Sequence, residues 1–302
     1  MNRIHTFFLL SLLLVSSLWA QVPTNNYFPA DLMKSEGIKS YMVFETQIDD
    51  PVAQSGKANR IRLAKNTVRQ AYFDREGLLT RTVWLSNDGK FVQREWKFGY
   101  DSKGQKIIES QKYFHTNNSD STKVLQTVER QMEYGAHGEL LTKNAFLRSK
   151  DESVHTDSVA YNRNEAHKLI EEISIQVNDL AGAKMTKKYT YGSESITVLT
   201  LVNDQTINRD EYTLDKEGRL SEAKFFTADE TEPRMKASYQ FHPRGWLEEI
   251  NYTHNWDFFK KEETVISQKN RYDDHGKLFE TQKDYGTGKR LFEFYDYSYF
   301  VN

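Results

Sequence analysis

The stretch from Tyr272 to Leu278 reads Tyr-Asp-Asp-His-Gly-Lys-Leu, and variants of it return along most of the chain. In each variant a bulky residue ends one segment and a polar triplet turns the chain. The glycine accepts the positive φ that other residues resist. The final Leu then starts a returning strand that faces the core. Each copy therefore predicts one β-hairpin.

Four further copies keep both the glycine and the closing Leu. They are FDREGLL (73–79), YGAHGEL (134–140), LDKEGRL (214–220) and FHPRGWL (241–247). Weaker copies begin at Leu85, Tyr100 and Tyr161. Such a hairpin cannot bury its own apolar face, so the copies must pack side by side as a repeat array. We expect positive φ at the turn glycines Gly77, Gly138, Gly218, Gly245 and Gly276.

The segments between the turns alternate in polarity with a period of two residues. Trp96, Phe98 and Tyr100 share one side of their segment, and the same alternation groups Leu169 with Ile173 and Ile175. No segment of the repeats sustains a helical period. The fold class predicted is all-β: an antiparallel, meandering and curled sheet of repeated hairpins. A short N-terminal helix is expected at PADLMKSE, where Pro29 suits a first helical turn.

The N-terminus has the layout of a secretory signal peptide. Asn2 and Arg3 precede an apolar run from Phe7 to Leu18, and Ala20 precedes a polar stretch that starts at Gln21. The run is short for a membrane span, although an uncleaved anchor is the alternative. No later apolar run reaches the ~18 residues of a spanning helix, so no integral span is expected after the signal is removed. A membrane β-barrel is disfavoured because the faces that would meet lipid carry Arg, Glu and Gln.

These features predict three parts of the chain. Residues 1–20 form the signal peptide, residues 21–58 a lead-in helix, first strand and loop, and residues 59–302 the β-hairpin repeat domain. The protein is expected to be exported to the periplasm, the cell surface or the extracellular space.

The turn unit resembles the YD repeat of the Rhs family, whose core is Tyr-Asp-x-x-Gly-x-Leu. Only residues 272–278 match that core in full, while Asp74 and Asp215 keep the aspartate and Tyr134 keeps the tyrosine. The resemblance covers roughly residues 70 to 290. It implies a curling antiparallel sheet, a secreted or cell-surface location, and binding or encapsulation, sometimes of carbohydrate. A looser similarity links the units to MORN-like repeats.

Composition and motifs exclude several functions. Lys and Arg number 41 against 43 Asp and Glu, so no basic footprint for nucleic acid exists. The chain has no cysteine, which excludes disulfides and thiolate sites. His137, His242 and His275 lie in predicted turns, and pairs such as Glu171–Glu172 are read as solvated strand positions whose side chains point to opposite faces. No catalytic residue, cofactor or metal site is predicted.

An aromatic stripe is the candidate binding surface. Trp246, Ile250, Tyr252, His254 and Trp256 fall on one face of a single predicted strand. If the stripe is exposed, Trp246, Tyr252 and Trp256 form a stacking platform for sugar rings; if it is buried, they belong to the core. The variable connections opposite the glycine turns, such as residues 115–122 and 255–263, are expected to gather on one rim.

The function predicted from the sequence is that of an exported, non-enzymatic repeat protein. It would bind a ligand or partner at the cell envelope or outside the cell, with a polysaccharide or an envelope protein as the candidates. Two alternatives stay open: an enzyme with catalytic residues scattered over the variable rim loops, and a purely structural scaffold of the envelope.

Overall fold

The computed structural model describes residues 28–48, 66–86, 90–114, 124–148, 153–176, 184–255 and 264–301. They form an 18-stranded antiparallel sheet and one short helix, α2 (Ala30–Ser35). The strands are β1 (Ile38–Ile48), β2 (Asn66–Phe73), β3 (Leu79–Leu85), β4 (Val92–Tyr100), β5 (Lys106–Phe114), β6 (Val124–Tyr134), β7 (Leu140–Arg148), β8 (Ser153–Arg163), β9 (Leu169–Gln176), β10 (Lys184–Tyr191), β11 (Ser195–Val202), β12 (Gln205–Leu214), β13 (Leu220–Thr227), β14 (Met235–Phe241), β15 (Leu247–His254), β16 (Val265–Tyr272), β17 (Leu278–Tyr285) and β18 (Arg290–Tyr299).

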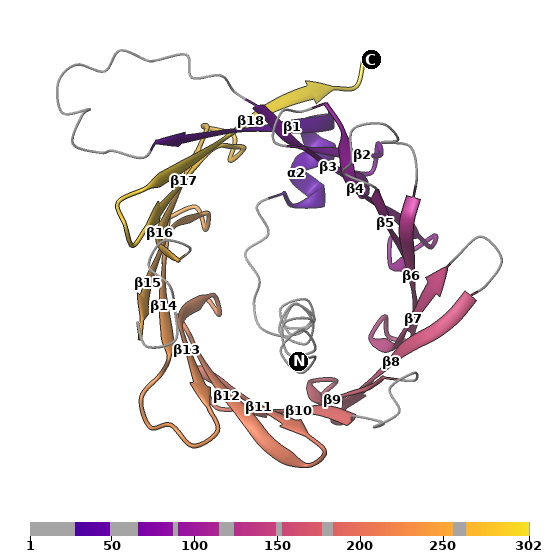
Figure 1. Ribbon diagram of the computed structural model, residues 1–302, viewed down its shortest axis with the longest axis vertical. Coiled ribbons are helices and arrows are strands. Elements are labelled where there is room, and N and C mark those ends of the chain that lie inside the picture. Colours follow the sequence, from indigo (N-terminus) through magenta and orange to yellow (C-terminus); the bar gives the residue numbers. More distant parts are fainter. Residues whose placement is uncertain are drawn as a thin grey trace.

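The sheet closes into a barrel (Figure 1). Each strand pairs with its neighbours in sequence, and β1 pairs with both β2 and β18. Tyr41 of β1 lies opposite Ala71 on one side and Tyr297 on the other. The predicted all-β, antiparallel class is confirmed. The description as a curled meander omitted the closure, which the strand before the repeats provides.

Helix α2 identifies the inner face of the barrel. Figure 1 shows α2 inside the ring of strands, beside β1. Its Met33, only 1% exposed, belongs to a core cluster with Tyr41, Val43 and Phe73. Since residues paired across an antiparallel ladder point to the same face, the registers carry this assignment around the whole ring. The inner wall so defined alternates aromatic rings with charged side chains.

A register shift beside the glycine turns changes which residues face inward. Asn162 pairs with Glu171 and Arg163 with Leu169, so Ile170 is an extra residue on the returning strand. Such a bulge reverses the alternation that follows it. Leu169 therefore shares the inner face with Glu172, and Ile175 is exposed on the outside. The sequence-based grouping of Leu169 with Ile173 and Ile175 is wrong for this reason, and so is the reading of Glu172, which is 2% exposed, as a solvated position.

The polar triplet and the glycine of each turn have defined roles. In the full copy, Asp273 accepts hydrogen bonds on Oδ1 from the backbone N–H of His275 at 3.0 Å and of Lys277 at 2.9 Å. Gly276 has φ +86° and donates its N–H to the Asp273 carbonyl at 3.0 Å. An aspartate side chain that bonds its own turn in this way explains its place in the motif. The other turn glycines, Gly77, Gly138, Gly218 and Gly245, also have positive φ.

Tyrosines link successive hairpins at this end of the barrel. Tyr272 Oη donates to the carbonyl oxygen of Leu247, the first residue of the preceding returning strand, at 2.9 Å. The same bond joins other pairs of hairpins at 2.7 to 2.8 Å: Tyr100 to Leu79, Tyr134 to Lys106, Tyr191 to Leu169 and Tyr297 to Leu278. The tyrosine of the motif therefore fixes the distance between neighbouring turns. We call this end the turn rim.

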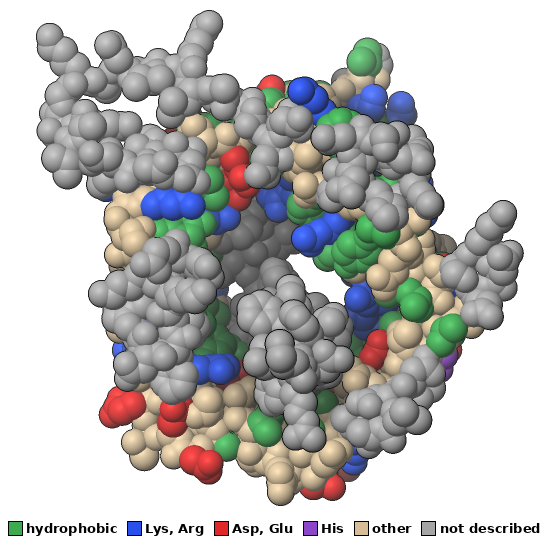
Figure 2. All heavy atoms as spheres, in the orientation of Figure 1, with side chains coloured by type: hydrophobic (Ala, Val, Ile, Leu, Met, Phe, Trp, Pro, Cys, Tyr) green, Lys and Arg blue, Asp and Glu red, His purple; other side chains and the backbone are tan. Residues whose placement is uncertain are grey.

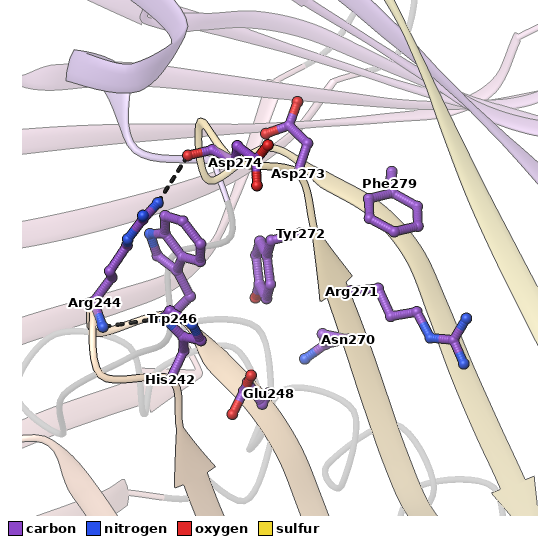
Figure 3. A pocket seen from close by; sticks show the side chains of 10 residues that line it. All are labelled: His242, Arg244, Trp246, Glu248, Asn270, Arg271, Tyr272, Asp273, Asp274 and Phe279. Carbon is purple, nitrogen blue, oxygen red and sulfur yellow. Dashed lines mark hydrogen bonds between the residues drawn. The ribbon is translucent and has the colours of Figure 1, made fainter.

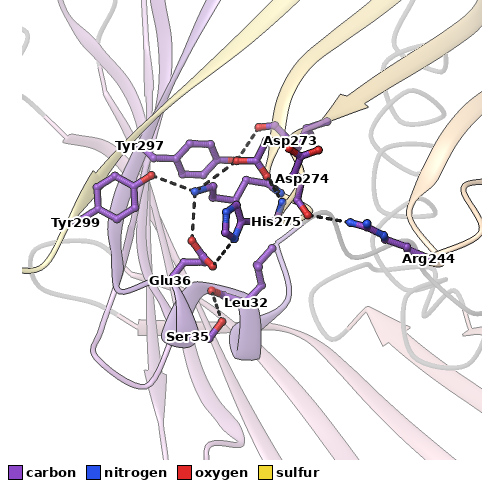
Figure 4. Close-up of polar contacts among 11 residues, drawn as sticks. Leu32, Ser35, Glu36, Arg244, Asp273, Asp274, His275, Tyr297 and Tyr299 are labelled. Carbon is purple, nitrogen blue, oxygen red and sulfur yellow. Dashed lines mark hydrogen bonds and ion pairs between the residues drawn. The ribbon is translucent and has the colours of Figure 1, made fainter.

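Helix α2 joins the two ends of the repeat array at the turn rim. Lys277 Nζ lies 3.3 Å from a carboxylate oxygen of Glu36, just after the helix, and His275 Nδ1 lies 3.3 Å from the other oxygen (Figure 4). On the other side, Lys34 pairs with Glu76 in the first turn of the array. A Cβ added to Gly77 would lie 2.1 Å from the Ala30 carbonyl oxygen. The helix is thus packed between the last glycine turn and the first.

Candidate binding site

The structure places two of the three residues of the predicted aromatic stripe, Trp246 and Tyr252, and puts them in different surroundings. Tyr252 lies in β15 on the inner wall and packs against the same core as Leu247 and Ile250. Phe241 pairs with Leu247 but Gln240 pairs with Glu249, so a bulge lies between them. Trp246 precedes this bulge and lies in the turn, not on the face of Tyr252. Trp256 lies outside the described residues. Trp246 and Tyr252 therefore do not form one continuous platform.

Trp246 is packed between two hairpins. Its ring is stacked on His242 of its own turn, with the ring centres 5.1 Å apart and the planes at 15°. Tyr272 of the next hairpin lies 5.5 Å away. A Cβ added to Gly276 would lie 2.7 Å from Cζ2 of the indole, so the ring also rests on the next turn. Trp246 consequently forms one wall of the space between the hairpins.

That space is a pocket of about 420 Å³ on the turn rim. Trp246, Tyr272 and Phe279 supply aromatic rings, and Glu248 and Asp274 supply carboxylates. Figure 3 shows the two carboxylates at opposite ends of the pocket, with Trp246 and Tyr272 between them. Phe279 is 42% exposed although it is a large hydrophobic residue. We call this feature the rim pocket.

The polar groups of the rim pocket differ in how far they are already engaged. Asp273 is occupied by its own turn and lies 3.4 Å from Lys277 Nζ. Arg244 donates to the backbone carbonyl of Asp274 at 2.9 Å and lies over the indole of Trp246. Within the described part of the chain, the carboxylates of Glu248 and Asp274 have neither an ion pair nor a hydrogen bond. These two carboxylates can accept hydrogen bonds from a ligand.

Phe279 was not singled out by sequence reasoning, and Glu248 was interpreted, with Glu249, only as a solvated strand position. Both follow directly on the Leu that closes a turn motif, Leu278 and Leu247, and both are the extra residue of a bulge. The bulge turns them away from the inner wall. The same position is Thr80, Leu141, Ile170 and Ser221 in other copies, so its composition gives no common signal. Its exposure can be inferred only once the bulge is known.

The inner wall carries buried ionisable groups whose pKa values are shifted. Glu172 and Lys187 are each 2% exposed, and their charged atoms lie 3.8 Å apart. Burial lowers the pKa of Lys187, while Glu172 and Asp210 oppose that shift. Burial raises the pKa of Asp210 to about 6, and its Oδ1 has no hydrogen-bond partner among the described residues. These groups are held in a wall of tyrosines that includes Tyr189 and Tyr212.

Two findings concern metals and membranes. Among the described residues, no group of three or more His, Cys, Asp or Glu side chains is placed to hold a metal ion. Of the predicted turn histidines, His137 has the ring of His167 from the neighbouring turn 4.8 Å away. No helix in the described ranges is long and apolar enough to cross a membrane.

Comparison with known proteins does not assign the chain to a family. No protein-family model matches the chain, and no curated protein sequence matches it. A porin-like protein from Bacteroides uniformis ATCC 8492 is 8% identical, with 86% of this chain and 98% of that chain covered and a TM-score of 0.31. One from Bacteroides vulgatus ATCC 8482 is 14% identical, with 71% and 95% covered and a TM-score of 0.33. The TcdB2-TccC3 structure is 11% identical over 71% of this chain and 17% of that chain, with a TM-score of 0.24. These TM-scores are below 0.5, so the likenesses carry no argument about function.

Proposed function

We propose that the protein is an exported, non-enzymatic barrel that binds carbohydrate through the rim pocket. The observation that carries the proposal is the lining of this pocket, in which three aromatic rings stand beside two carboxylates that have no hydrogen-bond or ion-pair partner among the described residues. The wall is preorganised, since Trp246 is held by His242 and Tyr272 and the turns themselves are fixed by hydrogen bonds.

The chemistry of a sugar ring fits this lining. Its C–H face packs against an aromatic ring, as apolar surfaces do, and Phe279 presents the most exposed ring of the pocket. Its hydroxyl groups donate hydrogen bonds, and charged carboxylates are strong acceptors for them. Glu248 and Asp274 lie at opposite ends of the pocket, so a ligand with hydroxyls on both edges would reach both.

Export rests on the sequence. The basic, apolar and small-residue segments of residues 2–20 favour secretion, and this region lies outside the described residues. An exported protein meets polysaccharides in the periplasm, at the cell surface or outside the cell. A partner protein of the envelope is the competing ligand class.

A glycan array tests the proposal. The secreted protein is applied together with the variants Phe279→Ala and Glu248→Gln. Ile170→Ala is the matched control, because Ile170 holds the same bulge position on β9 and is 40% exposed. We expect binding by wild type and by the control, and weaker binding by the two pocket variants. Binding to no glycan, or equal binding by all four proteins, would contradict the proposal.

A further inference from the structure

The inner wall of β3 to β7 holds a second cluster of aromatic rings. Trp84 of β3 lies 4.8 Å from Trp96 of β4, and Trp96 lies 6.3 Å from Phe98 (ring centres). Inward-facing Ala71 pairs with Thr82, and Thr82 pairs with Trp96, so Trp96 faces inward. Trp84 lies two residues from Thr82, and Phe98 lies two residues from Trp96, so both share this face. The buried Nε1 of Trp96 has no hydrogen-bond partner in the part of the chain that the structure describes. A donor without an acceptor in an aromatic wall is a place where a ligand oxygen can bind.

Positive charge exceeds negative charge around these rings. The inward-facing residues of β4 to β7 include four cations but one carboxylate, Glu109, which leaves an excess of three positive charges; the cations are Arg94, Lys106, Arg130 and Lys143. Glu109 is already engaged, 2.9 Å from Lys106 Nζ and 3.0 Å from Arg130 Nη1. On β4 to β7, therefore, one carboxylate stands against four cations.

Arg94 and Lys143 are the cations of this group that make no ion pair within the described residues, although the charges of Glu109 and Glu172 act on Lys143. Arg94 is exposed, lies over the ring of Tyr113 at 5.9 Å, and has no ion pair in the described part of the chain. Lys143 also lacks an ion pair there. Burial lowers the pKa of Lys143 and the charge of Arg130 lowers it further, while Glu109 and Glu172 oppose that shift. Lys143 lies near the like charges of Arg130 and Lys106, which disfavour its charged form, so a bound anion would stabilise this part of the wall.

The cluster is placed where a chain-like ligand could lie along it. Arg94, Trp96 and Phe98 are every second residue of β4 and therefore lie on one face. With a rise of about 3.3 Å per residue they span roughly 13 Å. Figure 2 shows hydrophobic and basic side chains bordering the central opening on the side of β4 and β5. Strand β4 thus offers two rings and one cation, Arg94, in one row.

We propose that this inner wall binds an acidic saccharide, with the rings of Trp84 and Trp96 against the sugar faces and Arg94 and Lys143 toward its acidic groups. The tryptophans favour a saccharide over an acidic peptide, because they offer stacking surface in addition to charge. The site is separate from the rim pocket, so it stands or falls independently of the proposed function.

The test is a calorimetric titration of the secreted protein with hexagalacturonate and with neutral maltohexaose as the uncharged probe. Arg94→Gln should weaken hexagalacturonate binding by about tenfold or more, because a charge-assisted hydrogen bond is lost. Lys97→Gln on the outer face of the same strand is the matched control and should bind like wild type. Phe279→Ala should also bind like wild type.

Each other outcome overturns the proposal. Failure of wild type to bind hexagalacturonate, or equal binding of the neutral probe, removes the acidic saccharide. Equal losses of hexagalacturonate affinity in Arg94→Gln and Lys97→Gln would contradict binding at the inner wall. A loss of affinity in Phe279→Ala would show that the saccharide binds in the rim pocket instead. Binding of polyglutamate or of oligothymidylate as tight as that of hexagalacturonate would show a general polyanion surface instead.

Discussion

Tyr272 Oη donates a hydrogen bond to the backbone carbonyl of Leu247 at 2.9 Å, and this bond spans the rim pocket from one hairpin to the next. The carbonyl of Leu247 also accepts from Asn270 Nδ2 at 3.0 Å, so one backbone atom holds two side chains of β16. The pocket wall is therefore positioned by the same bond that repeats between hairpins elsewhere on the turn rim. Stability and binding should be coupled here.

Removing this hydroxyl should destabilise the barrel. Tyr272→Phe keeps the ring but loses the bond, and we expect a fall of about 1 kcal/mol in the free energy of unfolding. Tyr285→Phe is the control, since no hydrogen bond of the Tyr285 hydroxyl occurs within the described residues. Urea unfolding of both variants measures the difference. Equal stability of Tyr272→Phe and wild type would contradict a stabilising role for the bond.

Two glycines with similar backbone angles should respond differently to alanine. Gly218 has φ +75° and nothing within 4 Å of an added Cβ, so Gly218→Ala should cost about 1 kcal/mol in backbone strain alone. Gly276 has φ +86°, but its Cβ would contact the indole of Trp246 at 2.7 Å. Gly276→Ala should lose about 1 to 3 kcal/mol more, because the ring must move. Thermal unfolding compares them, and a Gly218→Ala loss as large as that of Gly276→Ala would contradict the packing of Trp246.

Stability should depend on pH through Asp210. Burial raises its pKa to about 6 from 3.8, so the folded state binds the proton more tightly than the unfolded state. The resulting stabilisation is present in full below pH 3.8 and is lost as the pH rises through about 6. By linkage the loss at pH 7 is on the order of 3 kcal/mol.

The variant Asp210→Asn should remove this dependence. Unfolding free energies at pH 5 and pH 8 should differ less in Asp210→Asn than in wild type. Asp296→Asn, an exposed position on β18, should retain the wild-type difference. If all three proteins show the same pH profile, Asp210 is not the titrating group.

The secreted form should begin near Gln21. The basic start, the apolar run and Ala20 are the reason. N-terminal sequencing of the protein from its native compartment measures this directly, and an intact Met1 would contradict export through a cleaved signal.

The sequence predicted the strands well because the turn chemistry is local. In the copies that keep the aspartate, the Asp, the glycine and the closing Leu act within five residues of one another, as in the turn from Asp273 to Lys277. Closure could not be predicted, because it depends on β1 pairing with β18 across the length of the chain. The bulge could not be seen either, since it adds one residue without changing composition. That single residue moves Glu172 into the wall and Phe279 out into the rim pocket.

The central claim is that the rim pocket binds carbohydrate through the exposed ring of Phe279. The most direct measurement is the dissociation constant of the best glycan from the array, determined by calorimetry for wild type, Phe279→Ala and Ile170→Ala. The account predicts a loss of about tenfold, equivalent to about 1.4 kcal/mol, for Phe279→Ala and none for Ile170→Ala. Unchanged affinity in a folded Phe279→Ala protein would contradict it.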